Sequence, residues 1–427
     1  MNNDNPKAGS PSPHYPAHCQ RTHHIAQLQT NQTAIIAGRL IAQNTLADET
    51  GKIRFQLTSP PNIHLNDIVE LEGQLQNEIF YATSLRVLVP SLQTSQSDLT
   101  NTKQNHLRQR AKILAGIRRF FDQKDFVEIE TPLLVPQPGM EPHLEAFETT
   151  FENHTFYLHT SPEYAMKRLL SAGFERIYQI CKAFRHEPTA KMHNPEFTIL
   201  EWYRAYADYT HIMADTELLI AQLATELNGQ PLIHTAQHTI DLTPPWQRLT
   251  VKEALAHYAH ITADPYLEPI QFVTQARAQG HTMVTQSDPP DLAFFKVFLD
   301  GVEHHLGIKK PTILYDYPAP MAALAKRKTQ NPNLAERFEV YIAGVELANA
   351  FTELNDPTEQ HQRLKEESAL RRLEGNPAYP IDQHFLSALK HGMPPSGGIA
   401  LGIDRLVMLL VGASSIGDVI AFPLSDT

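Results

Sequence analysis

The sequence has few cysteines and no long apolar run. Its two cysteines, Cys19 and Cys181, cannot form a disulfide framework, and no CxxC pair is present to bind zinc. The 22 histidines include no HExxH motif, which argues against zinc catalysis. No hydrophobic stretch reaches membrane-spanning length, and the N-terminus has no signal-peptide core. These absences predict a soluble protein of the reducing cytoplasm that does not associate with a membrane.

The sequence also lacks the glycine-rich loops GxGxxG and GxxxxGK[ST], so a nucleotide would have to bind by another design. The net charge of -11 argues against a generally basic, nucleic-acid-coated surface, although it does not exclude a local basic groove. With 427 residues, 42% hydrophobic and 19% charged, the chain is globular and long enough for two domains.

The chain divides into four segments of different composition. Residues 1–28 are rich in proline and histidine and predict a disordered tail. Residues 29–92 contain four strand-like runs separated by polar turns, which predicts a small barrel or sandwich. Residues 93–104 are polar and rich in Ser and Thr, as in a linker, and residues 105–427 form the large domain. The four strand-like runs are residues 34–43, 52–57, 67–75 and 79–89.

The large domain mixes helical and strand-like patterns. Apolar residues at helical spacing from Leu107 to Phe121 predict a helix, and a strand-like run interrupted by Pro132 follows it. Further strand-like runs alternate with helices without the regular rhythm of a parallel βαβ domain. The expected fold class is therefore α+β.

The stretch FRHEPTAKMHNPEFTILEWYRAY, residues 184–206, combines cations, carboxylates and aromatic rings around a loop between two strand-like runs. Arg185 can contact an α-phosphate, and Glu187 can accept from an adenine amino group. His193 and Asn194 can reach phosphate oxygens, and Phe197 offers a ring for the base. Taken alone, this loop is as well explained by an exposed charged hairpin.

Two further segments favour the nucleotide, and a third offers a site for an amine. Glu339 and Glu346 lie on either side of an expected hairpin turn and could hold Mg²⁺, although a solvated acidic face is the alternative. Arg405 follows a glycine-rich strand and could clamp a γ-phosphate, or could simply begin a helix. Glu163, just after Ser161-Pro162, could bind an amine or could compensate a helix dipole.

Together these segments resemble the core of a class II aminoacyl-tRNA synthetase. RRFFDQKDFVEIETPLL is similar to its motif 1, with Pro132 at the dimer interface, and residues 184–203 and GGIALGIDRLVML are similar to motifs 2 and 3. The resemblance implies an antiparallel sheet with flanking helices, a homodimer, and an OB-like β-barrel for residues 29–92. HNPEF, GVELANAFTELND and GIDR resemble the lysyl branch.

Residues 105–427 resemble a paralogous family more closely, the elongation factor P β-lysine ligases, in TSPEYAMKRLL, ERFEVYIAGVELANAFTEL and YPIDQHFLSALKHGMP. This resemblance implies activation of lysine or (R)-β-lysine by ATP and Mg²⁺, and transfer of the acyl group to a lysine amine of elongation factor P without tRNA. The alternatives are a lysyl-tRNA synthetase with a reduced anticodon-binding domain and a non-catalytic regulatory paralogue.

The resemblance also implies residue roles, with Arg185 and Arg405 as the catalytic pair. The ATP contacts would be Arg185, His186, Glu187, His193, Asn194, Phe197, Glu346, Leu347, Gly402 and Arg405. The amino-acid contacts would be Ser161, Pro162, Glu163, Tyr203, Asn349 and Glu353, and the metal ligands Glu339 and Glu346.

Two positions depart from the patterns of the resembled families. Ala400 stands where the lysyl-tRNA synthetases have Gly, and its methyl group could reshape the amino-acid pocket toward β-lysine. His186 stands where the ligases have Asn. The front domain is also unusual for nucleic-acid binding, because residues 26–100 hold seven acidic residues against four basic ones. It could serve in docking or stability, or be a mere folding appendage.

Overall fold

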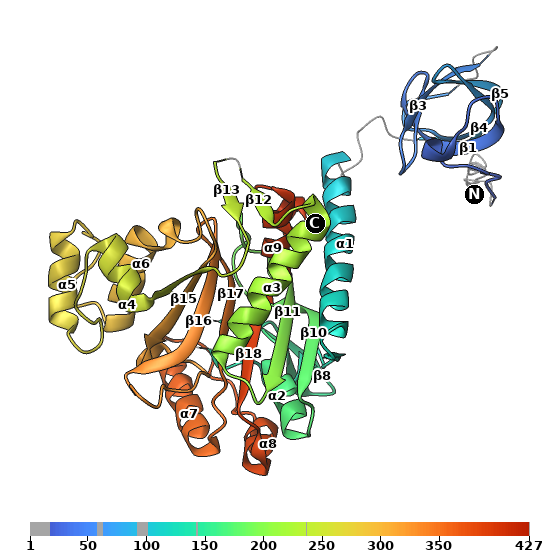
Figure 1. Ribbon diagram of the computed structural model, residues 1–427. Coiled ribbons are helices and arrows are strands. Elements are labelled where there is room, and N and C mark those ends of the chain that lie inside the picture. The colour runs from blue at the N-terminus through green and yellow to red at the C-terminus, as the bar shows by residue number, and fades with distance from the viewer. Residues whose placement is uncertain (1–17, 58–62, 92–100, 142–143, 236, 427) are drawn as a thin grey trace, which may run out of the picture. The chain divides into compact units, whose positions relative to one another are not determined.

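Figure 1 shows a computed structural model of the chain, which describes residues 18–57, 63–91, 101–141, 144–235 and 237–426. The chain forms two compact units, residues 1–98 and 99–427. The described residues include no helix long and apolar enough to cross a membrane.

The first unit contains a closed five-stranded barrel in the order β1-β2-β3-β5-β4. Inward residues such as Ile36, Leu71 and Phe80 are fully buried and form its core. Since alternate residues of a strand face opposite sides, the outward residues remain polar. The strands are β1 (Thr33–Ala42), β2 (Thr45–Ala47), β3 (Lys52–Leu57), β4 (Ile68–Gln76) and β5 (Ile79–Val89).

The barrel contains a strand that sequence periodicity did not reveal. β2 has only three residues and overlaps the polar run expected to be a turn. Part of the predicted tail also packs on the barrel: Ile25 is buried in its core, and the Gln20 N–H donates to Glu70. Residues 1–17 of the predicted tail and residues 93–100 of the predicted linker lie outside the described residues. Residues 101–104 are the first turn of α1.

The second unit is built on an eight-stranded sheet in the order β14-β15-β16-β17-β18-β11-β10-β6. Its pairs are antiparallel except for the outermost pair at each edge, β14 with β15 and β10 with β6. This confirms the α+β class with a largely antiparallel sheet. The strands are β14 (Gln247–Thr250), β15 (Thr312–Pro318), β16 (Leu334–Ile342), β17 (Val345–Thr352), β18 (Ser396–Gly402), β11 (Glu196–Ala205), β10 (Arg176–Phe184) and β6 (Val127–Glu128).

Two smaller sheets flank this one. The run interrupted by Pro132 divides between sheets, because β6 joins the large sheet and β7 (Leu134–Val135) pairs with β9. The other small strands are β8 (Glu148–Phe151), β9 (His154–Leu158), β12 (Leu232–His234) and β13 (Thr239–Asp241). The helices are α1 (Asn101–Asp122), α2 (Glu163–Ser171), α3 (Tyr209–Asn228), α4 (Val251–Ala254), α5 (Pro269–Ala278), α6 (Pro290–Gly301), α7 (Pro357–Leu373), α8 (Gln383–Gly392) and α9 (Ile403–Val411).

Alternation along the strands gives the large sheet two different faces. One face carries apolar residues such as Leu200, Trp202 and Ile399, which form a single core with α1, α3 and α9. In Figure 1, α3 crosses this face of the sheet and α1 runs alongside it. The opposite face carries polar residues, so it is the face available for a site.

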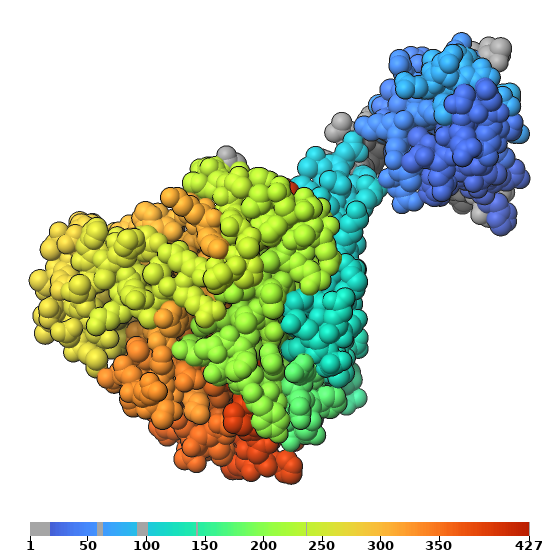
Figure 2. Space-filling model, viewed as in Figure 1, coloured from blue at the N-terminus to red at the C-terminus, as the bar shows by residue number. Residues whose placement is uncertain are grey.

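A helical insertion, α4 to α6, follows β14 and returns to the sheet at β15. It has a core of its own that includes Phe272, Phe294 and Val297. In Figure 2 this insertion forms the yellow lobe beside the green surface of α3. Three other helices flank the polar face of the sheet. Among them, α7 packs against α8, and α8 packs against α2.

Candidate functional site

A cavity of about 790 Å³ lies over the polar face of the large sheet. Its floor includes two rows of residues that face one another across neighbouring strands. The first row is Glu339, Asn349, Ala400 and Glu201, and the second is Arg337, Phe351, Gly398 and Tyr203. All of these residues except Glu201 and Gly398 line the cavity. Since paired residues point to the same side, residues far apart in sequence meet here.

The basic end of the cavity, defined by Arg185, His193 and Arg405, carries two guanidinium groups and an imidazole ring. The Arg185 guanidinium lies 5.0 Å from the centre of the Phe197 ring, and its buried Nε has no hydrogen-bond partner among the described residues. The Arg405 guanidinium donates to the Glu346 carbonyl at 2.7 Å and lies 3.3 Å from His193 Nε2. This end therefore presents positive charge and an unused donor to an anion.

Two carboxyl groups approach this basic end from the hairpin of β16 and β17. The turn consists of Ala343 and Gly344, both with positive φ, which confirms the predicted hairpin. Burial raises the pKa of Glu346 to about 7, Glu339 adds to the rise, and Arg405 opposes it. Glu346 has no side-chain hydrogen bond with any described residue, whereas Glu339 accepts from Arg337, Tyr317 and Tyr341.

The acidic end of the cavity is defined by Glu163 and Tyr203, which line it, and by Lys167, Glu201 and Glu353, which are buried behind them. It holds three carboxyl groups and one cation. Lys167 is fully buried, and its Nζ lies 2.5 Å from a carboxyl oxygen of Glu163 and of Glu353. Glu201, also fully buried, accepts from Ser161 at 2.6 Å and from Tyr203 at 2.9 Å. One ammonium therefore faces three carboxyl groups.

This imbalance shifts the pKa values of the acidic end. Burial raises the pKa of Glu201 to about 8, and the nearby Glu163 carboxylate adds to the rise. Burial also raises the pKa of Glu353, while the Lys167 ammonium opposes that rise. A second cation would relieve the repulsion, because an opposite charge favours the ionised form of a carboxyl group.

Gly398 makes this arrangement possible. A methyl group at this position would lie 2.1 Å from Glu353 Oε1 and 2.4 Å from Cε1 of the Tyr203 ring. Both distances are shorter than van der Waals contact, so only glycine lets the carboxyl group and the ring approach β18 so closely.

The structure brings most of the predicted site residues to the cavity, but not three of them. Pro162 begins α2 without lining the cavity, and His186 lies outside it, exposed and 3.0 Å from Glu145. Glu353 does not line the cavity, because it is buried and forms an ion pair with Lys167. The predicted residues that line the cavity are Ser161, Glu163, Arg185, Glu187, His193, Asn194, Phe197, Tyr203, Glu339, Glu346, Leu347, Asn349, Gly402 and Arg405.

Three of these residues also form hydrogen bonds within the protein. His193 Nδ1 lies 2.9 Å from Glu187 Oε2, so each orients the other. The Asn194 side chain donates to the Glu196 carbonyl and accepts from the Leu424 N–H, which anchors the loop to the C-terminal segment.

The structure adds residues that sequence reasoning missed. Lys167 stands four residues after Glu163, so the sequence contained a helical charge pair, but nothing indicated that it would be buried. Glu201 stands two residues before Tyr203, so both face one side of the strand, and that spacing could have revealed it. Glu141, Arg337 and Glu367 line the cavity without having been predicted.

The family model for tRNA synthetases class II (D, K and N) matches residues 92–426. A lysine–tRNA ligase of Trichormus variabilis is 34% identical over 95% of this chain and 83% of its own length. An elongation factor P–(R)-β-lysine ligase of Salmonella arizonae is 41% identical over 74% of this chain and 94% of its own length. The chain therefore belongs to the class II tRNA synthetases (D, K and N), a family of ATP-dependent ligases.

Proposed function

We propose that this protein activates a lysine-type amino acid, (R)-β-lysine, as an aminoacyl adenylate and transfers the acyl group to a lysine side-chain amine of elongation factor P. The acidic end of the cavity carries this proposal. Its three carboxyl groups share the single cation Lys167, and the terminal ammonium of a lysine would supply the missing positive charge.

The basic end suits a nucleoside triphosphate. Arg185 would contact the α-phosphate, whose charge grows as the substrate carboxylate attacks, and Arg405 would hold the departing pyrophosphate. Phe197 would stack on the adenine ring. The Arg185 guanidinium lies over the Phe197 ring and so would be next to the nucleotide. Binding both substrates in one cavity aligns the attacking oxygen and the phosphorus, which lowers the entropic part of the barrier.

The residues at the hairpin fit a divalent cation. Glu346 has no side-chain hydrogen bond with any described residue, and its pKa is raised by burial and by Glu339, as expected for a pair without its counter-ion. Glu339 and Glu346 would hold Mg²⁺, which would neutralise phosphate oxygens of the nucleotide. The described residues contain no group of three or more metal-ligating side chains, so phosphate and water would complete the coordination.

Similarity to the elongation factor P–(R)-β-lysine ligases supports the protein acceptor, because those relatives match over nearly their whole length at the higher identity. A second candidate is a lysine–tRNA ligase. It is favoured by one observation, that relatives of that name align over 95% of this chain.

The two candidates differ in the acceptor, which one assay separates. Purified protein is incubated with ATP and labelled α-lysine or (R)-β-lysine, and with elongation factor P or tRNA. We expect label on elongation factor P, with (R)-β-lysine as the better substrate. Label on tRNA alone would establish the second candidate, and absence of ATP–pyrophosphate exchange with either isomer would refute both.

We also propose that the protein works in the cytoplasm as a homodimer through the segment around Pro132. Apolar residues near it are partly exposed in the single chain, namely Val127, Leu133 and Leu134. A monomer by sedimentation at working concentrations would contradict this assembly.

A further inference from the structure

The cavity has a third region, which we call the acidic lobe: Glu141, Leu144, Arg363, Glu366, Glu367 and Leu370. Four of these residues belong to α7. Glu366, Glu367 and Leu370 follow Arg363 by three, four and seven positions. Such residues share one face of a helix, so this face of α7 forms one wall. The chain at Glu141 and Leu144 supplies further lining.

A buried arginine ties these two segments together. Arg371 of α7 is fully buried and donates to the carbonyl oxygens of Glu141 and Leu144, each at 2.7 Å. Its guanidinium also lies 4.3 Å from the centre of the Tyr379 ring. The two segments that form the acidic lobe are therefore held together by charge-assisted hydrogen bonds, so the lobe has a defined shape.

Two polar atoms in this region are buried without a hydrogen-bond partner among the described residues. They are Glu141 Oε2 and Thr160 Oγ1, and the Thr160 side chain is only 1% exposed. Both lie against Gly139, since a methyl group there would be 2.2 Å from the first atom and 3.0 Å from the second. Buried polar groups are usually paired. Glu141 Oε2 can accept a hydrogen bond, and the Thr160 hydroxyl can donate or accept one.

The charges of the acidic lobe are also unbalanced. Glu367 forms no hydrogen bond or ion pair with any described residue. Two arginines share its helix face, and both donate elsewhere. Arg363 donates to the carbonyl oxygens of Ala323 and Ala325 and to Glu359. Arg371 donates to the carbonyl oxygens of Glu141, Leu144 and Pro377. The acidic lobe thus suits a small cation with several N–H donors, such as a primary ammonium.

The protonation behaviour of Glu367 agrees with this. Burial raises the pKa of Glu367 to about 8, Glu141 adds to the rise and Arg363 opposes it. The other charged groups that face it are Glu163 and Glu366. A carboxyl group with such a pKa can accept a proton from an ammonium and release it again near neutral pH.

We propose that the acidic lobe receives the primary ammonium of the acceptor lysine, and that Glu367 takes a proton from it to produce the nucleophilic amine. This inference rests on the proposed function, since it names the site for the second substrate of that reaction. Glu141 is a positioning residue, which accepts a hydrogen bond from the same nitrogen.

The step balances in atoms and charge. The ammonium gives one proton to the Glu367 carboxylate, and the neutral amine attacks the carbonyl carbon of the acyl adenylate. A C–N bond forms, the C–O bond of the mixed anhydride breaks, and AMP leaves with the bonding electron pair. The second nitrogen proton passes to water or to the AMP phosphate, and Glu367 returns its proton to solvent.

Conservative variants of the full-length protein test the proposal. Glu367→Gln and Glu141→Gln remove the carboxylates with little change of shape, and Glu374→Gln, at the exposed end of α7 and outside the cavity, is the matched control. Three rates are compared: ATP–pyrophosphate exchange, hydroxamate formation with hydroxylamine, and acyl transfer to elongation factor P. Hydroxylamine is uncharged at neutral pH and needs no proton removed before it attacks.

We expect the ratio of transfer to exchange to fall about a hundredfold in Glu367→Gln, the usual size of a general-base contribution, and at least tenfold in Glu141→Gln. Hydroxamate formation should follow exchange in every variant. Wild-type transfer should rise with pH and level off above about 8 as Glu367 ionises. Transfer by Glu367→Gln should instead keep rising above pH 8, because it depends on the neutral fraction of the acceptor lysine.

Unchanged ratios in both carboxylate variants would overturn this inference and leave the proposed function standing. A raised KM for the amino acid in exchange by Glu141→Gln would also overturn it, because Glu141 would then bind the first substrate. Wild-type protein that makes hydroxamate but labels no lysine amine of elongation factor P would refute the proposed acceptor, and this inference with it.

Discussion

Binding of a lysine-type substrate should release a proton from Glu201. Burial and the nearby Glu163 raise the pKa of this carboxyl group to about 8, so in the free protein at pH 7 it is mostly protonated. An incoming ammonium stabilises the ionised form, so the proton must leave on binding. Affinity for the substrate should therefore increase with pH, although the substrate ammonium itself remains charged.

The size of this effect follows from the pKa. With a pKa of about 8, roughly one molecule in a hundred has Glu201 ionised at pH 6, and half of the molecules do at pH 8. Affinity should thus rise about fiftyfold between these two pH values if Glu201 must be ionised in the complex. If Glu353 also loses a proton on binding, the rise will be steeper.

Calorimetric titration of the protein with the lysine isomer measures both quantities. The same titration in buffers of different ionisation enthalpy gives the number of protons released, which should approach one at pH 7. Glu201→Gln should bind more weakly at pH 8, lose most of the pH dependence, and differ least from wild type at pH 6. Glu196→Gln is a matched control, because this carboxylate is half-exposed on the same strand and pairs with Lys182. Affinity that stays flat or falls between pH 6 and pH 8 would refute the reasoning.

Further predictions concern the basic end, the buried cation, the cavity floor and the barrel. Arg185→Ala should reduce ATP–pyrophosphate exchange by two orders of magnitude or more, because an oriented cation at the α-phosphate is lost. Lys167→Met should lower the free energy of unfolding by about 3–5 kcal/mol by leaving buried carboxylates unpaired. The loss should be larger at pH 8.5 than at pH 6 in urea titrations, because the Glu201 and Glu353 carboxyls, whose pKa values are raised in the folded state, are protonated at the lower pH. Ala400→Gly should shift exchange from β-lysine toward α-lysine, and an unchanged preference would exclude a role of this methyl group. A chain that begins at residue 99 should retain exchange, since each unit has its own core.

The sequence predicted the strands and much of the cavity lining for a physical reason. β10, β11 and the β16–β17 hairpin are runs rich in apolar and aromatic residues, which predict strands although their burial does not alternate strictly. Glu339 and Asn349 both line the cavity and face one another across neighbouring strands. Once the strand pairing is known, these residues must lie on one face, so a correct fold brings them together.

The pairing of Lys167 with Glu353 could not be predicted in this way. Glu163 and Lys167 have the spacing of a common surface ion pair, which contributes little to stability. Their burial depends on how α2 packs against the sheet and α8, which no local pattern encodes. The same limitation applies to the acidic lobe, because Glu141 and Glu367 are more than two hundred residues apart and meet only through tertiary packing.

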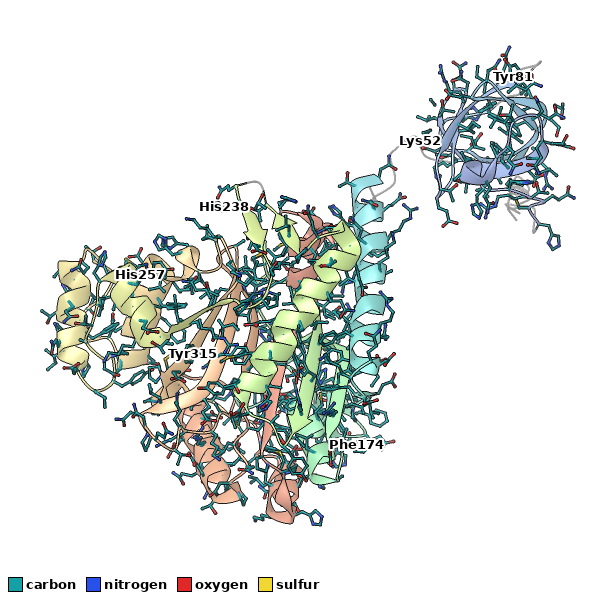
Figure 3. All side chains as sticks on the ribbon, viewed as in Figure 1. Lys52, Tyr81, Phe174, His238, His257 and Tyr315 are labelled. Carbon is teal, nitrogen blue, oxygen red and sulfur yellow. The ribbon has the colours of Figure 1, made fainter. Side chains whose placement is uncertain are left out.

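The barrel does not by itself decide which acceptor the enzyme uses. The alignment with lysine–tRNA ligases covers 95% of this chain, which includes the barrel. The alignment with the elongation factor P ligases covers 94% of their own length but only 74% of this chain. On the outside of the barrel, Arg39, Lys52 and Arg54 are exposed, and Tyr81 is partly exposed (Lys52 and Tyr81 are labelled in Figure 3). Those few cations could assist binding of any acidic partner, whether RNA or protein. The covalent step requires something more specific, since a tRNA hydroxyl arrives neutral and a lysine amine arrives as a cation that must lose a proton. A carboxyl group that can take up this proton is needed for a lysine amine and not for a tRNA hydroxyl. If the proposed role of Glu367 holds, the acidic lobe, rather than the barrel, would distinguish the two acceptors.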